Sequence, residues 1–400
     1  MTETTPLRVV IVGGGVAALE SLIALRDMAG DLVDVTLIAP EMAFTYRPMT
    51  VAQPFSAGRA RRYELSEIAA RFGARLVRDT VAQVDTDARA VRTAAGDLVT
   101  YDRLVLAVGA KAAPVSRFAI TFGEDPDEKA LHGLLRDTEE GYVESVAFVA
   151  PSDITWALPL YELALMTARQ AWSMGANRVR FYLITPEHRP LAIFGTAASD
   201  AVAELLEASG IEFIGSAYAS VGHKVVTIDP AGRQLGVDRV VSLPTLEGPS
   251  IPGVPVNPDG FIPVDKHCRV AGLEGVYAAG DGIAFPIKQG GLATQQADAV
   301  AEAIAHEIGA RDHAAPFRPV LRGLLLTGGD DRYLRHRVAG GGGEPAVATE
   351  ALWWPPSKIA GRYLAPYLFG EDELETIEEI KAGHLPIELL LDHPGEATRP

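Results

Sequence analysis

One stretch near the start constrains the fold more than any other, because an apolar run ends in three glycines and then continues with helical periodicity. The residues Val9-Val10-Ile11-Val12 are β-branched and favour a buried parallel strand, and Ala17 to Met28 has the spacing of a helix. Gly13 permits a sharp turn, Gly15 has no Cβ and lets a phosphate approach the backbone, and small Ala18 lets the helix pack closely on the strand. The stretch therefore predicts a strand–turn–helix unit with a pyrophosphate site at the helix N-terminus.

A second predicted strand, Asp34 to Ile38, follows this helix, and Glu41 comes shortly after it. An acid at this position can accept hydrogen bonds from ribose hydroxyls. A solvated loop carboxylate is the alternative, because Ala39-Pro40 delays the acid by two residues. Arg47, in the turn-rich loop that follows, either neutralises a phosphate or is an ordinary surface arginine.

Composition excludes several classes of protein. A chain of 400 residues predicts two or three domains, and its net charge of −16 argues against nucleic acid and against broad attraction to anionic lipid. No apolar run approaches the ~20 residues of a membrane span, and the N-terminus has no signal-peptide pattern. We therefore expect a cytoplasmic protein, with peripheral contact to a membrane surface left open. The histidines lack metal-ligand spacing, so we expect no metal site.

The rest of the first unit contains short alternating segments and a further strand. Residues 75–77, 90–93 and 98–101 predict a small antiparallel insertion with a turn at Ala95-Gly96-Asp97. The segment Tyr101 to Ala110 predicts a buried strand that ends at Gly109 and returns to the parallel sheet beside the first strand.

A second strand–helix–strand–helix pattern follows, over residues 145–150, 158–174, 178–184 and 197–209. Its first turn, Ala150 to Trp156, contains no glycine. Pro151 removes an N–H, Asp153 brings a negative charge, and Trp156 adds bulk where a cofactor backbone needs room. We expect that this unit does not hold NAD(P)H in the usual way, unless a different loop takes the phosphates.

The chain then carries a short predicted strand that ends in Gly280-Asp281. Gly280 allows close approach, and the Asp281 carboxylate can accept hydrogen bonds from a polyol chain. A helix from about Leu292 to Ile308 follows Lys288, Gln289 and Gly290, and its start directs a positive dipole end at whatever lies before it.

The last part, residues 314–400, predicts a separate layer that begins with a strand over 320–326. Trp353-Trp354 either walls a pocket for a planar substrate, covers an interface such as that of a homodimer, or packs in the core. The acidic run Glu371 to Glu379 predicts a solvated helix face.

The glycine turn at 13–15, the strand that ends at Gly109 and the Gly280-Asp281 motif, in this order and spacing, resemble the flavoproteins with two dinucleotide-binding domains, which include the pyridine nucleotide–disulfide oxidoreductases. The resemblance covers residues 8–310 and is strongest to the sulfide:quinone oxidoreductase and type II NADH dehydrogenase branch. It implies an α/β fold of two Rossmann-like three-layer domains plus a C-terminal α+β layer. The FAD-binding domain would comprise 1–115 and 246–313, the second domain 116–245, and the C-terminal layer 314–400.

The resemblance also implies roles for individual residues. Gly13, Gly15 and Ala18 would hold the FAD pyrophosphate and Glu41 the adenosine ribose. Gly280 and Asp281 would hold the ribityl chain, while the helix that starts at Gly290 would direct its positive end at the flavin. The remaining candidates are Arg47 and Gly109 for cofactor binding, Lys288 and Gln289 at the flavin ring, and Trp156, Tyr161 and Trp353-Trp354 at its open face.

The single cysteine, Cys268, cannot form the internal pair that sulfide oxidases and disulfide reductases of this superfamily use. We therefore expect an FAD-dependent oxidoreductase that exchanges electrons directly between the flavin and a small organic or quinone-like substrate. One alternative is an NAD(P)H-dependent flavoprotein reductase that serves a protein or quinone acceptor, with Glu187 as a ribose ligand. Another is a redox-silent flavin-binding accessory subunit.

Overall fold

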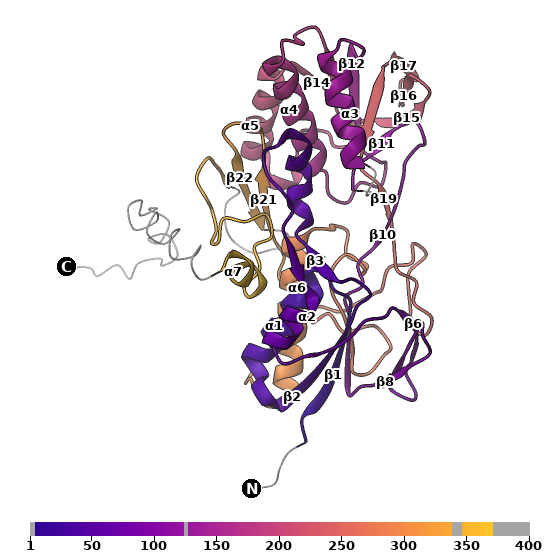
Figure 1. The fold of residues 1–400 in the computed structure, drawn as a ribbon, viewed down its shortest axis with the longest axis vertical. Coiled ribbons are helices and arrows are strands. Elements are labelled where there is room, and N and C mark those ends of the chain that lie inside the picture. The colour runs from indigo at the N-terminus through magenta and orange to yellow at the C-terminus, as the bar shows by residue number, and fades with distance from the viewer. Residues whose placement is uncertain (1–4, 124–126, 338–345, 371–400) are drawn as a thin grey trace, which may run out of the picture.

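The structure is a computed structural model that describes residues 5–123, 127–337 and 346–370. Two parallel five-stranded sheets form its framework, and they lie at opposite ends of the long axis (Figure 1). The C-terminal elements lie alongside the junction between them. The predictions for Glu371 to Glu379 fall outside the described residues.

The first sheet has the order β20-β9-β1-β2-β5, and every neighbouring pair in it is parallel. Its strands are β1 (Leu7–Val12), β2 (Val33–Ile38), β5 (Arg75–Val77), β9 (Arg103–Leu106) and β20 (Val276–Ala278). As predicted, β9 pairs beside β1. The prediction for 75–77 was wrong, because these residues form the edge strand β5 of the parallel sheet rather than part of an antiparallel insertion.

The side chains of β1 alternate between two cores, which explains the three layers of this unit. Val9 and Ile11 pack with the helices α1 (Val16–Ala29) and α6 (Gly290–Glu307). Val10 and Val12 pack on the other face, against an antiparallel sheet of three strands. Those strands are β6 (Val81–Asp85), β7 (Ala90–Thr93) and β8 (Leu98–Thr100). Since both faces of the sheet are covered, most residues of its central strands β1, β2 and β9 are apolar and buried.

The second sheet has the order β11-β18-β12-β13-β14 and is also entirely parallel. One face is covered by three helices and the other by a three-stranded antiparallel sheet. The parallel strands are β11 (Ile120–Thr121), β12 (Ser145–Val149), β13 (Arg180–Ile184), β14 (Ile211–Ile214) and β18 (Arg239–Ser242). The covering elements are α3 (Asp127–Glu139), α4 (Leu158–Ser173), α5 (Thr196–Ala208), β15 (Tyr218–Gly222), β16 (Val225–Asp229) and β17 (Arg233–Gly236).

A third antiparallel sheet and a short helix follow α6 and pack on both units. These elements are β21 (Val320–Leu325), β22 (Arg332–Arg337), β23 (Ala346–Ala348) and α7 (Leu364–Phe369). Strand β21 contacts α4 of the second unit and α6 of the first, and α7 contacts α1. The predicted architecture of two Rossmann-like units and an α+β layer is confirmed.

Smaller elements connect these parts. They are η1 (Gly30–Leu32), β3 (Ala43–Thr45), η2 (Arg47–Phe55), β4 (Arg62–Glu64), α2 (Leu65–Arg71), β10 (Lys111–Ala113), η3 (Ala192–Phe194) and β19 (Thr245–Glu247). The 3-10 helix η2 leaves the first unit and packs against α3 and α4 of the second. Within the described ranges, no helix combines the length and the apolar character that crossing a membrane requires.

Candidate functional site

The glycine turn between β1 and α1 leaves open space in front of the helix. Gly13 has φ +126°, and a Cβ on it would collide with the carbonyl oxygen of Ala107 at the end of β9. Its N–H donates to the carbonyl of Ile38 over 2.8 Å, which ties the turn to β2. Gly15 precedes the helix, and a Cβ there would meet no atom within 4 Å. The N–H groups of the first helical turn therefore face room that a phosphate can enter.

Glu41 lies over this same turn. Its carboxylate is exposed, and a Cβ built on Gly14 would lie 3.2 Å from Glu41 Oε2. The two extra residues after β2 thus bring the acid back to the glycines instead of carrying it away.

The Gly280-Asp281 motif at the end of β20 meets the start of α1. Gly280 has φ +83°, and its N–H donates to Gln296 Oε1 of α6 over 2.8 Å. A Cβ on Gly280 would lie 3.1 Å from the Cβ of Ala17, so the motif and the glycine turn are neighbours. Gly109 also belongs here, because its carbonyl oxygen lies 3.0 Å from where Gly282 would carry a Cβ.

Two cations, Lys288 and Arg47, lie near Asp281. Burial raises the pKa of Asp281, and the positive charges of Lys288 and Arg47 oppose that rise. Lys288 is itself buried, which lowers its pKa to about 8 against the attraction of Asp281. Its ammonium donates to the carbonyl of Ile283 and lies 3.8 Å from the centroid of the Phe261 ring. The site therefore combines one carboxylate with two cations.

Gln289 is committed to the protein framework. Its Oε1 accepts the N–H of Leu292 over 2.8 Å and so caps α6, while Nε2 donates to the carbonyl of Arg322 in β21 over 3.0 Å. The oxygen and the nitrogen of the side-chain amide thus each already have a protein partner. Gly290 starts the helix, and a Cβ on it would lie 3.0 Å from Ile359 Cγ1, so the C-terminal segment packs directly on this helix end.

The corresponding turn of the second unit is filled by its own side chains. Trp156 is half-buried and packs edge-on against Phe194, with ring centroids 5.7 Å apart. Tyr161 is fully buried and donates its hydroxyl to Glu187 Oε2 over 2.6 Å, and Thr185 donates to the same oxygen over 3.2 Å. Burial raises the pKa of Glu187, which these hydrogen bonds oppose. The acid after β13 thus points into its own unit.

A buried ion pair that the sequence analysis missed joins α4 to the C-terminal segment. Lys358 Nζ lies 2.6 Å from Oε1 and 2.7 Å from Oε2 of Glu162, and the two side chains are only 6% and 0% exposed. Glu162 also accepts the N–H of Leu326 over 2.9 Å, and Lys358 donates to the carbonyl of Pro48 over 3.2 Å. Burial raises the pKa of Glu162, and the ammonium of Lys358 opposes that rise. The available signal in the sequence was the carboxylate of Glu162 inside the otherwise apolar run 158–168, which indicates a buried charge that needs a partner.

The position of this pair relates it to the start of α6 and to the charged cluster around Asp281. Ile359, the residue after Lys358, packs on Gly290 at the start of α6, and its N–H donates to the hydroxyl of Tyr46 over 3.0 Å. Pro48, which Lys358 contacts, is adjacent to Arg47 of the charged cluster around Asp281. Glu162 and Lys358 are therefore linked, through residues adjacent in the chain, both to the start of α6 and to Arg47 near Asp281.

A second buried carboxylate, Glu20 of α1, holds the start of α7. It accepts the N–H groups of Tyr363 and Leu364 over 2.9 and 2.7 Å. Asp298 of α6 lies beside it, and burial together with the charge of Glu20 raises the pKa of Asp298 to about 8. The C-terminal segment is therefore tied to α1 through Glu20 and to α4 through Glu162.

Trp353 belongs to this segment and folds back on it. Its indole N–H donates to the carbonyl of Ser357 over 2.9 Å, and its ring packs edge-on against Tyr333 at 5.1 Å. Among the described residues, no group of three His, Cys, Asp or Glu side chains is arranged to hold a metal ion.

Comparison with known proteins adds the family. The model of the pyridine nucleotide-disulphide oxidoreductases matches residues 7–140 and 163–304. A sulfide-quinone reductase of Aquifex aeolicus is 25% identical over 362 residues, which cover 80% of each chain. An NADH dehydrogenase-like protein of Mycobacterium tuberculosis is 27% identical over 299 residues, 68% of this chain and 72% of that protein. The crystal structure of the sulfide:quinone oxidoreductase of Aquifex aeolicus superposes with a TM-score of 0.78 at 19% identity, over 97% of this chain and 96% of the other.

Proposed function

The chain belongs to the pyridine nucleotide-disulphide oxidoreductase family, and we propose that it is an FAD-dependent oxidoreductase that passes electrons directly between the flavin and a quinone-like or other small organic substrate. The observation that carries the proposal is that the turns at Gly13–Gly15, Gly109 and Gly280–Gly282 are neighbours, with open space at Gly15 and at Gly109.

The residues of this region fit FAD. The free space at Gly15 and the helix N-terminus behind it suit a pyrophosphate, and Glu41 above the turn suits a ribose. Asp281 would accept hydrogen bonds from the ribityl hydroxyls, with Lys288 nearby to balance charge. When bound, FAD supplies two-electron redox chemistry, which the single cysteine of this chain cannot supply through an internal disulfide.

Cysteine chemistry is not available as the electron relay. Cys268 is the only cysteine in the sequence, so no internal disulfide can form. It is buried in the core beside β20, and burial raises the pKa of its thiol to about 12. A thiol of this kind is inert near neutral pH, because the thiolate is the reactive form.

The packing of Glu187 favours a small substrate over NAD(P)H as the partner of the flavin. A ribose needs an acid with free acceptor oxygens, and Glu187 Oε2 already accepts two hydrogen bonds from its own unit. The turn before α4 adds the side chains of Pro151 and Trp156 where a pyrophosphate would lie.

Reduction of a quinone consumes protons as well as electrons, and the Glu162–Lys358 pair is suited to supply one. Lys358 Nζ shares its protons among Glu162 and the carbonyl of Pro48 in a site closed to solvent. Burial raises the pKa of Glu162 and so favours its protonated form, which the ammonium of Lys358 opposes. We assign this pair the role of holding a proton near the charged cluster of Asp281, Lys288 and Arg47.

The first experiment asks whether the purified protein is yellow and releases FAD on denaturation. The bound flavin is then reduced photochemically without oxygen and mixed with a soluble quinone such as menadione in a stopped-flow instrument. We expect rapid reoxidation by the quinone and slow reduction by NADH and NADPH. A colourless protein that takes up no FAD contradicts the whole proposal.

The variant Glu162→Gln tests the role of the ion pair, because it keeps the shape and removes the titrating carboxyl. We expect a lower rate of quinone-dependent reoxidation and a changed pH profile, with unchanged flavin content. Fast reduction by NADH at micromolar concentration would instead establish the NAD(P)H-dependent reductase. A bound flavin that neither donor nor quinone affects would establish the accessory subunit.

A further inference from the structure

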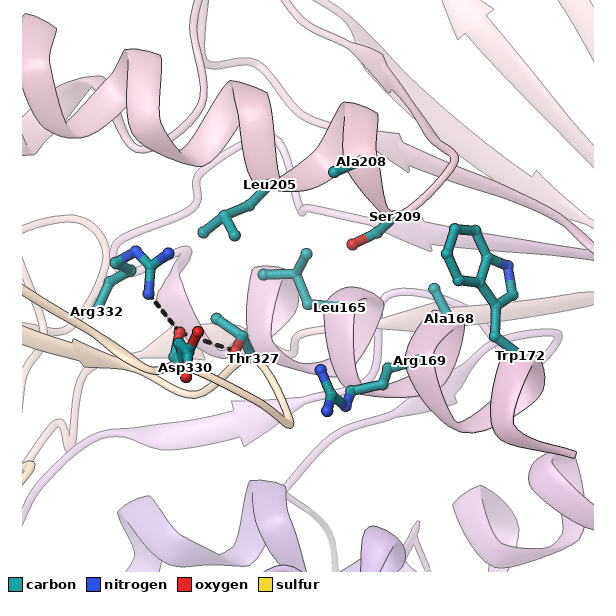
Figure 2. A pocket seen from close by; sticks show the side chains of 10 residues that line it. All are labelled: Leu165, Ala168, Arg169, Trp172, Leu205, Ala208, Ser209, Thr327, Asp330 and Arg332. Atoms are coloured by element: carbon teal, nitrogen blue, oxygen red, sulfur yellow. Dashed lines mark hydrogen bonds between the residues drawn. The ribbon is translucent and has the colours of Figure 1, made fainter. Parts of the chain in front are cut away.

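A cavity of about 260 Å³ lies on the second unit, between α4, α5 and the turn that joins β21 to β22 (Figure 2). Leu165 and Ala168 line it from α4, Leu205 projects toward them from α5, and Ser209 follows the end of α5. It shares no residue with the motifs assigned to FAD. The interior is thus apolar on the two helices and polar at the turn.

Arg169 of α4 reaches this cavity with a guanidinium group that has no hydrogen bond or ion pair to any other residue described in the structure. The side chain is exposed and lies against the turn. A Cβ on Gly328 would lie 2.9 Å from Arg169 Cδ, and one on Gly329 would collide with Nη1. The two glycines of the turn therefore make the room in which this side chain lies.

A second arginine approaches the turn from the other side, so that Thr327 and Asp330 lie between the two guanidinium groups (Figure 2). Arg332 Nη1 donates to the carbonyls of Asp330 over 2.6 Å and Asp331 over 3.2 Å, which fixes its orientation. The turn itself is rigid, because Thr327 accepts from the N–H of Gly329 and donates to the carbonyl of Asp330. Arg332 is thus oriented before any ligand arrives, and Arg169 lies exposed beside the same turn.

Donors exceed acceptors among the side chains that line the cavity. Beyond the two guanidinium groups, Ser209 offers a hydroxyl and Trp172 an indole N–H that is bonded to no other described residue. Trp172 is 50% exposed at the rim. Asp330 brings the one carboxylate among the lining side chains, which gives these side chains a net charge of +1, and the carboxylate of Asp331 borders them by accepting the N–H of Thr327 over 3.0 Å. This combination selects an anion with an apolar body.

We propose that this cavity binds a small monocarboxylate with an apolar body, of the size of benzoate, with its carboxylate at Arg169 and Arg332 and its body between Leu165, Leu205 and Trp172. The volume allows it, since an engineered cavity of about 150 Å³ already holds benzene. The proposal goes beyond the redox function and does not depend on it.

The test titrates the full-length protein with benzoate and follows tryptophan fluorescence and heat. We expect saturable quenching in the wild type and its loss in Trp172→Phe, which identifies the one of four tryptophans that reports binding. Arg169→Met should weaken binding about 10-fold or more, as expected for a lost charge-assisted hydrogen bond. Arg178→Met, an exposed arginine outside the cavity, should bind as the wild type does.

Benzyl alcohol, which has the same ring without the charge, should bind more weakly than benzoate. The proposal is overturned if benzoate produces no saturable signal, if quenching persists in Trp172→Phe, or if Arg169→Met binds with unchanged affinity. Equal affinity for benzyl alcohol and benzoate would equally overturn it, because the arginines would then contribute nothing.

Discussion

The variant Lys358→Met should destabilise the protein far more than the loss of an ordinary lysine. The change leaves the carboxyl of Glu162 fully buried with the N–H of Leu326 as its remaining hydrogen-bond donor. Removal of one partner of a buried ion pair costs about 3–5 kcal/mol, against a total stability of roughly 5–15 kcal/mol for a folded domain. The neutral form of Glu162 is tolerated better than the charged form, so the loss should grow as pH rises through its raised pKa.

Urea unfolding followed by circular dichroism measures this cost. The matched control is Lys224→Met, because Lys224 is 62% exposed and lies 3.9 Å from Asp238. That surface pair should contribute about 0–1 kcal/mol. The double variant Glu162→Met/Lys358→Met should regain most of the stability, with about 1 kcal/mol still missing for the unpaired N–H of Leu326. A single variant that loses less than about 1 kcal/mol, or a double variant as unstable as the single, would refute this account of the pair.

Three further predictions concern the cofactor turn, the helix α6 and the second unit. Gly15→Ala should fold normally, since its Cβ meets no protein atom, and should lose FAD affinity because the Cβ enters the space proposed for the pyrophosphate. Gly13→Ala should also lower the melting temperature, because its Cβ collides with the backbone of Ala107. Equal melting temperatures of the two variants would contradict this geometry. Asp298→Asn should raise the free energy of unfolding at pH 8.5 by about 1 kcal/mol or more. The pKa of Asp298 is raised to about 8 in the folded protein, so the wild type loses stability as pH rises from about 4 through 8, whereas asparagine does not titrate. Asp87→Asn, at an exposed position, is the control. Glu187→Ala should leave the rate of flavin reduction by NADH unchanged in stopped-flow measurements, and a clear fall would support its use as a ribose ligand.

Local sequence determined the framework of this protein. The β-branched run before Gly13 requires burial on both faces, which a parallel sheet between two covering layers provides. Gly13 and Gly280 mark positions where a side chain would not fit, and Gly15 marks one where a side chain would block a ligand. Such constraints can be inferred from the glycines in the sequence. The edge strand Arg75–Val77 was misassigned because three residues carry too short a pattern to distinguish parallel from antiparallel pairing.

Tertiary structure alone decided which side chains meet. Glu162 and Lys358 are 196 residues apart in the chain, and Glu20 and Leu364 are 344 apart, so no spacing could have linked them. The cavity beside Arg169 likewise needs α4, α5 and the β21–β22 turn in contact. Periodicity and turn chemistry act over a few residues and specify elements, whereas the partners of a buried charge depend on how those elements pack, because only packing removes the water that would otherwise be its partner.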